Sequence, residues 1–333
     1  MPINNSLEPV KLPMEQKWNK KPETIFMNNL DAIEITCIDG PTHEDLMKYI
    51  PNFVNATWND EPLKEYDQKF RAQRVYDTLH FKTLPTAMET IGYTFCIKGI
   101  SMQEVSHILR HRRASFSAEC SGDKWWTDKI ALIPNSVQHS NGNGENSTFE
   151  HPDEDDIHNR YMKIVAEAKQ LYQDMIDTKK ISIMDARYIL PRCLETYYFM
   201  RMSYNDIVAF CKQRFDTQIQ PETDNIIAYK MWKAVLEKNP LAFGVINPHD
   251  PKLYGFYKST FRQGTGTNLY WPCKDADDFE FNEKDTIYPC TRDKMNGTDE
   301  NAPYYYGELA AKLDKELEEL EAKGKKLFED LTK

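Results

Sequence analysis

A strand pattern followed directly by a helix start constrains the fold of this chain more than any other stretch. Apolar residues occupy every second position of residues 91–98, IGYTFCIK, which is the pattern of a half-buried β-strand. The segment SMQE at 101–104 then has the spacing of a capping box and predicts the start of a helix. This helix is predicted to end at Arg110–Arg113, so four adjacent basic residues mark the point where the chain leaves regular structure.

Other patterns predict one further strand and several helices, which together indicate a mixed α/β (α+β) chain. The run AIEITCI at 32–38 predicts the strand. Helices are predicted at 41–58 (broken near Pro51), from 157 onward, and at 186–193, 203–214, 222–238 and 304–333. The polar segment 134–156 predicts a long exposed loop. Leucines recur along the last helix, where Gly324 is expected to weaken the apolar seam.

The charge and composition of the whole chain limit what the basic cluster can bind. The chain has 333 residues, with 42 basic against 52 acidic residues and a net charge of −10, which disfavours a broad nucleic-acid-binding face. Seven scattered cysteines without a CxxC pair indicate reduced thiols and no metal site. No apolar run reaches signal-peptide or membrane-spanning length. We therefore expect a soluble, cytoplasmic protein with a small anionic ligand and no membrane partner.

The basic cluster has two explanations when it is taken alone. Cations in the last turn of a helix interact favourably with the helix dipole, by a few tenths of a kcal/mol each. The residues that follow favour a nucleotide instead, because Ser115, Ser117, Glu119 and Ser121 lie in one short segment. Guanidinium groups bind phosphates in a bidentate manner, hydroxyl groups add donors, and a carboxylate can accept from ribose hydroxyls.

The segment RHRRASFSAECSGDKW at 110–125 resembles the signature of the flavin-dependent thymidylate synthases. That signature consists of Arg-His-Arg, two variable residues, Ser, a variable residue, Asn-Glu, a variable residue and Ser. Residues 110–112 match the triplet, Ser115 matches the first serine, and Glu119 and Ser121 match the later pair. Ser117 stands where the family has asparagine, with one inserted residue after it.

Two further blocks occur in the order that the family has. ARYILPRCLETYYFMRMSYNDIVAFCKQR at 186–214 resembles the second conserved half, with Arg187 at the phosphate-binding position and Arg214 at the position that contacts the uracil ring. PTAMETIGYTFCIK at 85–98 and VNATW at 54–58 resemble two earlier flavin-contacting segments. The resemblance covers roughly residues 35–240.

The resemblance implies a fold with a central, mostly antiparallel sheet flanked by helices. It divides the chain into an N-terminal arm (1–30), the enzyme-like domain (31–240) and a C-terminal extension (241–333) that ends in a long amphipathic helix. It also implies reductive methylation of dUMP to dTMP by a homotetramer, with FAD as cofactor and methylenetetrahydrofolate and NADPH as co-substrates. The protein then orients its ligands and the flavin performs the redox step.

The resemblance also assigns roles to individual residues, and no metal ligand is among them. Arg214 is the catalytic candidate, since its fixed charge can stabilise negative charge that develops on the uracil. The candidate substrate-binding residues are His107, Arg110, Glu119, Ser121, Arg187 and Arg214. The candidate flavin-binding residues are Thr57, Thr86, Glu89, Arg110, His111, Arg112, Glu119, Ser203 and Asn205. Cys120 lies inside the motif, but a lone cysteine is more often structural than nucleophilic.

Departures from the family pattern keep two alternatives open. Where the family has Asn, Arg and Asn facing the flavin, this chain has Ser203, Asn205 and Ala209, and Leu84 replaces a histidine. One alternative is a related enzyme that acts on another pyrimidine nucleotide or installs a hydroxymethyl group. The other is a non-catalytic nucleotide-binding homologue.

Overall fold

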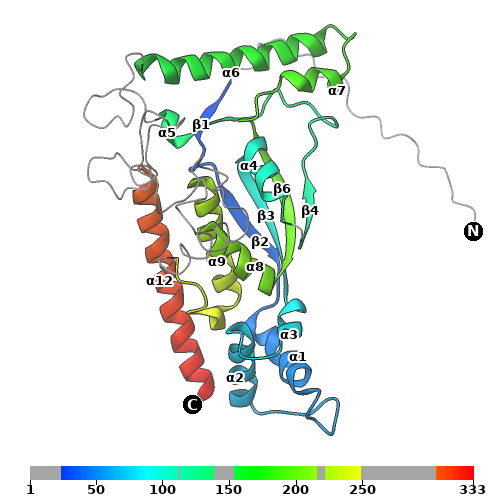
Figure 1. Ribbon diagram of the computed structural model, residues 1–333, viewed down its shortest axis with the longest axis vertical. Helices are drawn as coiled ribbons and strands as arrows, with labels where there is room; N and C mark the ends of the chain where they lie inside the picture. The colour runs from blue at the N-terminus through cyan, green and yellow to red at the C-terminus, as the bar shows by residue number, and fades with distance from the viewer. Residues whose placement is uncertain (1–23, 112, 139–153, 216–221, 249–304) are drawn as a thin grey trace, which may run out of the picture.

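The computed structural model describes residues 24–111, 113–138, 154–215, 222–248 and 305–333, around a four-stranded antiparallel sheet (Figure 1). The strands follow the order β2-β3-β6-β4. Their bounds are Glu34–Asp39 (β2), Gly92–Ser101 (β3), Glu195–Ser203 (β6) and Ala114–Ala118 (β4). The alternation at 91–98 predicted β3 correctly, and the predicted antiparallel sheet is confirmed.

Strand β6 lies where the sequence analysis predicted no strand. The helix predicted at 186–193 is wrong: helix α7 covers only Ile183–Ala186, and a single 3-10 turn, η1, covers Arg187–Ile189. Leu190 is extended, with φ −61° and ψ 126°, because the residue before a proline disfavours the helical region. Pro191 therefore ends the helical segment and directs the chain into β6.

Helices cover one face of the sheet. Helix α8 (Tyr204–Arg214) and helix α9 (Glu222–Lys238) pack on it, as the patterns at 203–214 and 222–238 predicted. Side chains from alternate strand positions, including Phe95 and Met200, share one buried core with Phe210 and Trp232. In the described part of the chain, the opposite face of the sheet is open, with Phe199 and Arg201 exposed.

Three helices near the end of β2 close the lower part of the molecule in Figure 1. They are α1 (His43–Asn55), α2 (Gln68–Leu79) and α3 (Pro85–Glu89). The predicted break near Pro51 is wrong, because α1 continues through this proline. Leu46, Ile50 and Val54 are all buried, and their spacing of four residues keeps one apolar face of α1 on the core.

A second apolar cluster lies at the other end of the sheet. Short strands β1 (Phe26–Asn28) and β5 (Ala131–Ile133) pair in parallel. Helix α6 (Glu154–Asp177), predicted from its apolar periodicity, packs there through Val165 and Tyr172. Within the predicted loop 134–156, Asn135–Gln138 form the short helix α5, and residues 139–153 lie outside the described residues.

The predicted C-terminal helix is present as α12 (Tyr305–Thr332) and runs beside α9 and α2 (Figure 1). Leu313 and Leu317 are buried in the main core. Gly324 does not weaken this packing: a Cβ atom at this position would overlap the carbonyl oxygen of Pro240, in the 3-10 turn η2 (Pro240–Ala242). The missing side chain lets the two backbones approach closely. No helix among the described residues is long and apolar enough to cross a membrane.

We expect Gly324→Ala to lower the free energy of unfolding by about 1–3 kcal/mol, because the new methyl group meets backbone that cannot rotate away. Chemical denaturation with a matched Lys323→Ala control, at an exposed position of the same helix, measures the difference. Helix propensity alone predicts the opposite sign, a gain of about 1 kcal/mol for glycine to alanine, so increased stability would contradict the close packing.

Candidate active site

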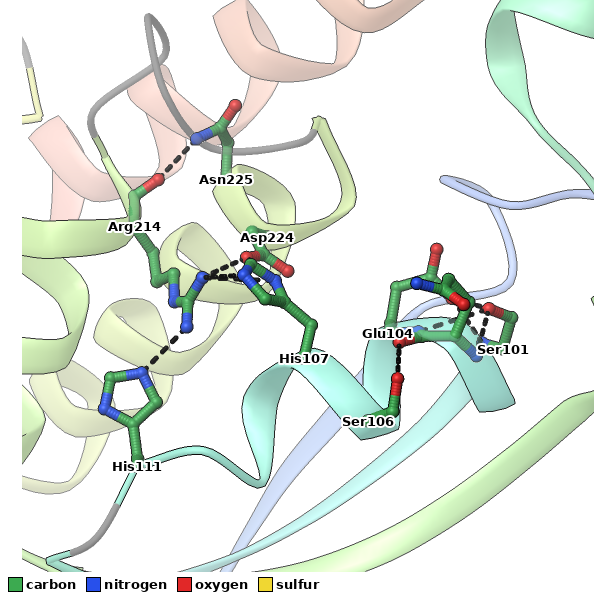
Figure 2. Close-up of polar contacts among 9 residues, drawn as sticks. Ser101, Glu104, Ser106, His107, His111, Arg214, Asp224 and Asn225 are labelled. Atoms are coloured by element: carbon green, nitrogen blue, oxygen red, sulfur yellow. Dashed lines mark hydrogen bonds and ion pairs between the residues drawn. The ribbon is translucent and has the colours of Figure 1, made fainter. Parts of the chain in front are cut away.

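A buried arginine at the C-terminal end of α8 is the centre of the candidate site (Figure 2). The Arg214 side chain is 3% exposed and forms an ion pair with Asp224, in the first turn of α9. Nη2 of Arg214 donates to Nε2 of His111 at 2.8 Å. Nδ1 of His107 lies 3.0 Å from Oδ2 of Asp224 and 3.3 Å from Nη1 of Arg214. A cation, a carboxylate and two imidazoles therefore share one cluster.

The two histidines come from the end of α4 and from the segment that follows it. Helix α4 covers Met102–Ile108, and its predicted capping box is confirmed, with the Ser101 hydroxyl accepting from the backbone of Glu104. The helix ends at Ile108, before the predicted end at Arg110–Arg113. His107 therefore lies in its last turn, and His111 lies in the segment just after it, with its N–H donating to the Ile108 carbonyl at 3.1 Å.

The environment of His111 keeps its imidazole neutral at pH 7. Burial, and next the positive charge of Arg214, lower the pKa of His111 from 6.5 to about 4. A neutral ring has one acceptor nitrogen, and the donation from Arg214 assigns this role to Nε2. The Phe210 ring meets the His111 ring edge to face, with centroids 4.7 Å apart. Arg214 is thus held by a carboxylate on one side and a neutral imidazole on the other.

Tyr198 of β6 belongs to the same neighbourhood and was missed by the sequence analysis. Burial, and next the charge of Asp224, raise the pKa of Tyr198 well above its usual value. Its buried hydroxyl has no hydrogen-bond partner among the described residues. Buried hydroxyl groups are normally paired, so this atom lacks the partner that such groups usually have. Asp224 was missed as well, since its partners lie close to it only in the folded chain.

The carboxylate of Glu119 is already paired with other side chains of this chain. Its side chain is 1% exposed and forms ion pairs with Lys124 and, at 2.6 Å, with Lys129. The hydroxyl of Thr196 donates to it at 3.1 Å. Burial raises the pKa of Glu119, but the two lysines lower it by more, so the net shift is downward. Both ammonium groups also lie over the Tyr197 ring. The predicted contact of Glu119 with a nucleotide stays a prediction.

The segment after Glu119 brings two other predicted substrate residues close to one another. A Cβ atom on Gly122 would lie 2.9 Å from Nη1 of Arg187, so the half-buried Arg187 guanidinium packs on the backbone next to Ser121. Arg110 is exposed in the segment after α4.

Several predicted flavin residues lie at the opposite end of α8 from Arg214. Helix α8 has 11 residues, so its two ends are about 16 Å apart at the usual rise per residue. Ser203 caps the N-terminal end, where its hydroxyl accepts from the Asp206 N–H and donates to its carboxylate at 2.7 Å. Asn205 is half-buried in the first turn.

A shallow pocket of about 410 Å³ opens beside this end of α8, and Glu89 and Ser203 line it. Thr86 lies on the exposed side of α3, next to Glu89. Thr57 is exposed in the turn after α1. It lies beside Trp58, which lines a separate cavity of about 380 Å³. Arg112 lies outside the described residues.

The segment after α4 connects the two ends of α8. His111 contacts Arg214 at the C-terminal end, and Arg113 lies 3.7 Å from Asp206 in the first turn. In the described residues no group of three or more His, Cys, Asp or Glu side chains could hold a metal ion, and the five described cysteines are free thiols.

Comparison with known proteins identifies the family. The family described as "Thymidylate synthase complementing protein" matches residues 42–241, which is more than half of the chain. The chain belongs to this family, that of the flavin-dependent thymidylate synthases.

Its relatives are distant. The flavin-dependent thymidylate synthase of Pyrococcus furiosus is 22% identical over 190 residues, 56% of this chain and 70% of that protein. The enzyme of the same name from Clostridium tetani is 27% identical over 165 residues, 48% of this chain and 65% of that protein. Among solved structures, the UMP/dUMP methylase PolB from Streptomyces cacaoi, bound with 5-Br dUMP, superposes with a TM-score of 0.51 at 15% identity. This match covers 66% of the present chain and 94% of PolB, and it confirms the fold.

We expect acid to destabilise the protein in part through His111. A histidine whose pKa is lowered in the folded state binds fewer protons there than in the unfolded state, so stability rises with pH between the two values. For His111 this range runs from about 4 to 6.5. Urea denaturation at a series of pH values should therefore give a shallower loss of stability for His111→Gln than for the wild type. Parallel curves would contradict the buried, neutral imidazole.

Proposed function

We propose that this protein catalyses the reductive methylation of dUMP to dTMP. Methylenetetrahydrofolate would supply the carbon and NADPH the reducing equivalents, in a reaction that also forms tetrahydrofolate and NADP⁺. The observation that carries the proposal is the cluster of Arg214, Asp224, His107 and His111, in a chain of the flavin-dependent thymidylate synthase family. FAD, when bound, supplies the hydride chemistry that no side chain can provide.

Arg214 has the properties that stabilisation of a developing anion requires. Its guanidinium is permanently charged, buried and fixed by partners on two sides. A charge fixed in a site shielded from water stabilises a developing anion without having to reorganise. We assign it to the carbonyl side of the uracil ring. In this proposal His107 and the Tyr198 hydroxyl provide further polar contacts to the nucleotide.

The 5′-phosphate is assigned to the cations outside this cluster. Arg187 packs beside the segment that contains Ser121, and a guanidinium next to a hydroxyl is a suitable donor pair for a phosphate. Arg110, exposed after α4, would complete this set. A nucleotide held in this way would extend from Arg187 towards Arg214.

The donor set beside α3 suits the flavin dinucleotide. Glu89, Thr90, Ser115 and Ser203 are among the residues that line the pocket at the start of α8, so its wall includes a carboxylate and three hydroxyl-bearing side chains. These groups match the hydroxyl-bearing ribityl and ribose portions of FAD, and a carboxylate accepts well from such hydroxyls. We assign Thr86, Glu89, Ser203 and Asn205 to the flavin, together with Thr57, His111 and Arg112.

We also propose a homotetramer, which is supported by the open face of the sheet and by the exposed positions of Thr57, Thr86 and Glu89. Light scattering should then give four times the chain mass of 39.0 kDa.

Two further statements remain predictions. They are the division of the chain into residues 1–30, 31–240 and 241–333, and the cytoplasmic location.

The experiment that tests the function begins with the absorption spectrum of the purified protein. We expect a flavin spectrum, and release of tritium from 5-tritiated dUMP only when methylenetetrahydrofolate and NADPH are both present. Mass spectrometry should find a methyl group on the product. A hydroxymethyl product or turnover of another pyrimidine nucleotide would favour the related enzyme. Binding of FAD and dUMP without turnover would favour the non-catalytic homologue.

In the same assay, Arg214→Gln should lower kcat by about a hundredfold or more, as the loss of a preorganised charge does elsewhere. The rate is measured per folded molecule, because the variant leaves the buried Asp224 without its partner. The matched control is Arg192→Gln, since Arg192 also contacts α4, through a hydrogen bond to the exposed Gln103. An equal loss of activity in both variants would contradict the role of Arg214.

A further inference from the structure

Two arginines that the resemblance does not assign line the pocket at the start of α8. Arg201 lies on β6 and Arg113 just before β4, and Gly92, at the start of β3, lines the same pocket. The pocket of about 410 Å³ has two guanidiniums and two carboxylates, Glu89 and Asp206, in its wall, in a chain with a net charge of −10. A pair of guanidiniums suits a phosphate-bearing ligand.

Arg201 donates hydrogen bonds to side chains of β3 and β2. Thr94 and Ser115 are its cross-strand partners. Its Nη1 donates to Asp39 at 2.6 Å and to Thr94 at 2.7 Å. Among the described residues, its Nη2 and Nε have no partner. These two nitrogens are parallel donors on one edge of the guanidinium, which is the arrangement that binds two oxygens of one anion.

Gly92 allows the guanidinium of Arg201 to pack closely against the backbone of β3. A Cβ atom at position 92 would be 3.0 Å from Nη2 and 3.4 Å from Cζ of Arg201. The absence of a side chain therefore leaves room for the Nη2 and Nε edge of the arginine beside β3, where Gly92 itself lines the pocket.

Arg113 supplies the second cation. It lies just before β4, the strand that flanks β6 on the side away from β3. Its side chain is 77% exposed and lies 3.7 Å from Asp206. The other oxygen of Asp206 already accepts from Ser203 at 2.7 Å. Arg113 is therefore only loosely paired, and a guanidinium that is exposed and loosely paired can turn towards a ligand at little cost.

We propose that Arg201 and Arg113 bind the diphosphate of FAD in this pocket. This proposal rests on the proposed function, and it adds two residues to the flavin site. The pocket also carries two carboxylates, Glu89 and Asp206. Asp206 is already paired with Arg113 and accepts from Ser203, and Glu89 suits the ribose hydroxyls on either side of the diphosphate. The pocket thus carries cations for the phosphates and acceptors for the sugars.

The test compares the binding of FAD with that of riboflavin, which has the same ring system but no phosphate. Equilibrium dialysis gives both dissociation constants for the wild type and for Arg201→Gln, and thermal denaturation verifies that the variant is folded. We expect Arg201→Gln to weaken FAD binding about tenfold to a hundredfold, as the loss of charge-assisted hydrogen bonds does elsewhere. Riboflavin should bind both proteins alike. Arg113→Gln should act in the same direction.

Asp39→Asn is the matched control, because it removes the surface partner of Arg201 and leaves the guanidinium in place. FAD binding should be unchanged or tighter in this variant. Unchanged FAD binding by Arg201→Gln would overturn the proposal. Weakening by Asp39→Asn to the same degree, or an equal loss of riboflavin and FAD by Arg201→Gln, would also overturn it, since both results indicate a structural role. If the wild type itself fails to bind FAD, the proposed function fails, and this inference fails with it.

Discussion

The ion pair between Arg214 and Asp224 is the interaction on which the site depends. Both side chains are almost completely removed from water, and burial costs several kcal/mol per ion unless the charges are paired and hydrogen-bonded. The pair meets this requirement with His107 on the carboxylate and His111 on the guanidinium. It also connects the C-terminal end of α8 to the first turn of α9. The same contacts that stabilise two helices thereby fix a permanent positive charge near the end of the sheet.

The sheet topology explains how residues so distant in sequence meet. Strands β3 and β6 are antiparallel neighbours, and each ends at a serine that caps the following helix, Ser101 for α4 and Ser203 for α8. The two helices therefore start at opposite ends of the sheet. Helix α8 runs back along the sheet and brings Arg214 to the end where α4 presents His107. The segment after α4 then contacts both ends of α8, through His111 and Arg113.

The sequence predicted the elements whose periodicity was unambiguous. Strand β3 alternates cleanly, and α8, α9 and α12 have clear helical patterns. Strand β6 was missed because Tyr197 and Phe199, on the open face, are as apolar as the buried Tyr198 and Met200, and this hides the period of two. The helix break predicted near Pro51 was wrong for a different reason. The packing of α1 outweighs the helix-breaking tendency of a proline.

The site could be predicted only where the motif itself carried the residue. The resemblance supplied His107, His111 and Arg214, which the structure brings together. It could not supply Asp224 or Tyr198, because charge complementarity and burial exist only in the folded chain. The ion pairs of Glu119 with Lys124 and Lys129 could not be predicted for the same reason. Local sequence indicated which groups could bind an anion, and tertiary structure decided which of them are already paired.

A double-mutant cycle on the buried pair tests the central claim most directly. Arg214→Met and Asp224→Leu should each lower the free energy of unfolding by about 3–5 kcal/mol, because each leaves one buried charge without its partner. The double variant should lose much less than the sum of the two, since it buries no unpaired charge. Strictly additive losses, or single variants as stable as the wild type, would show that the two charges do not depend on each other and would contradict the account.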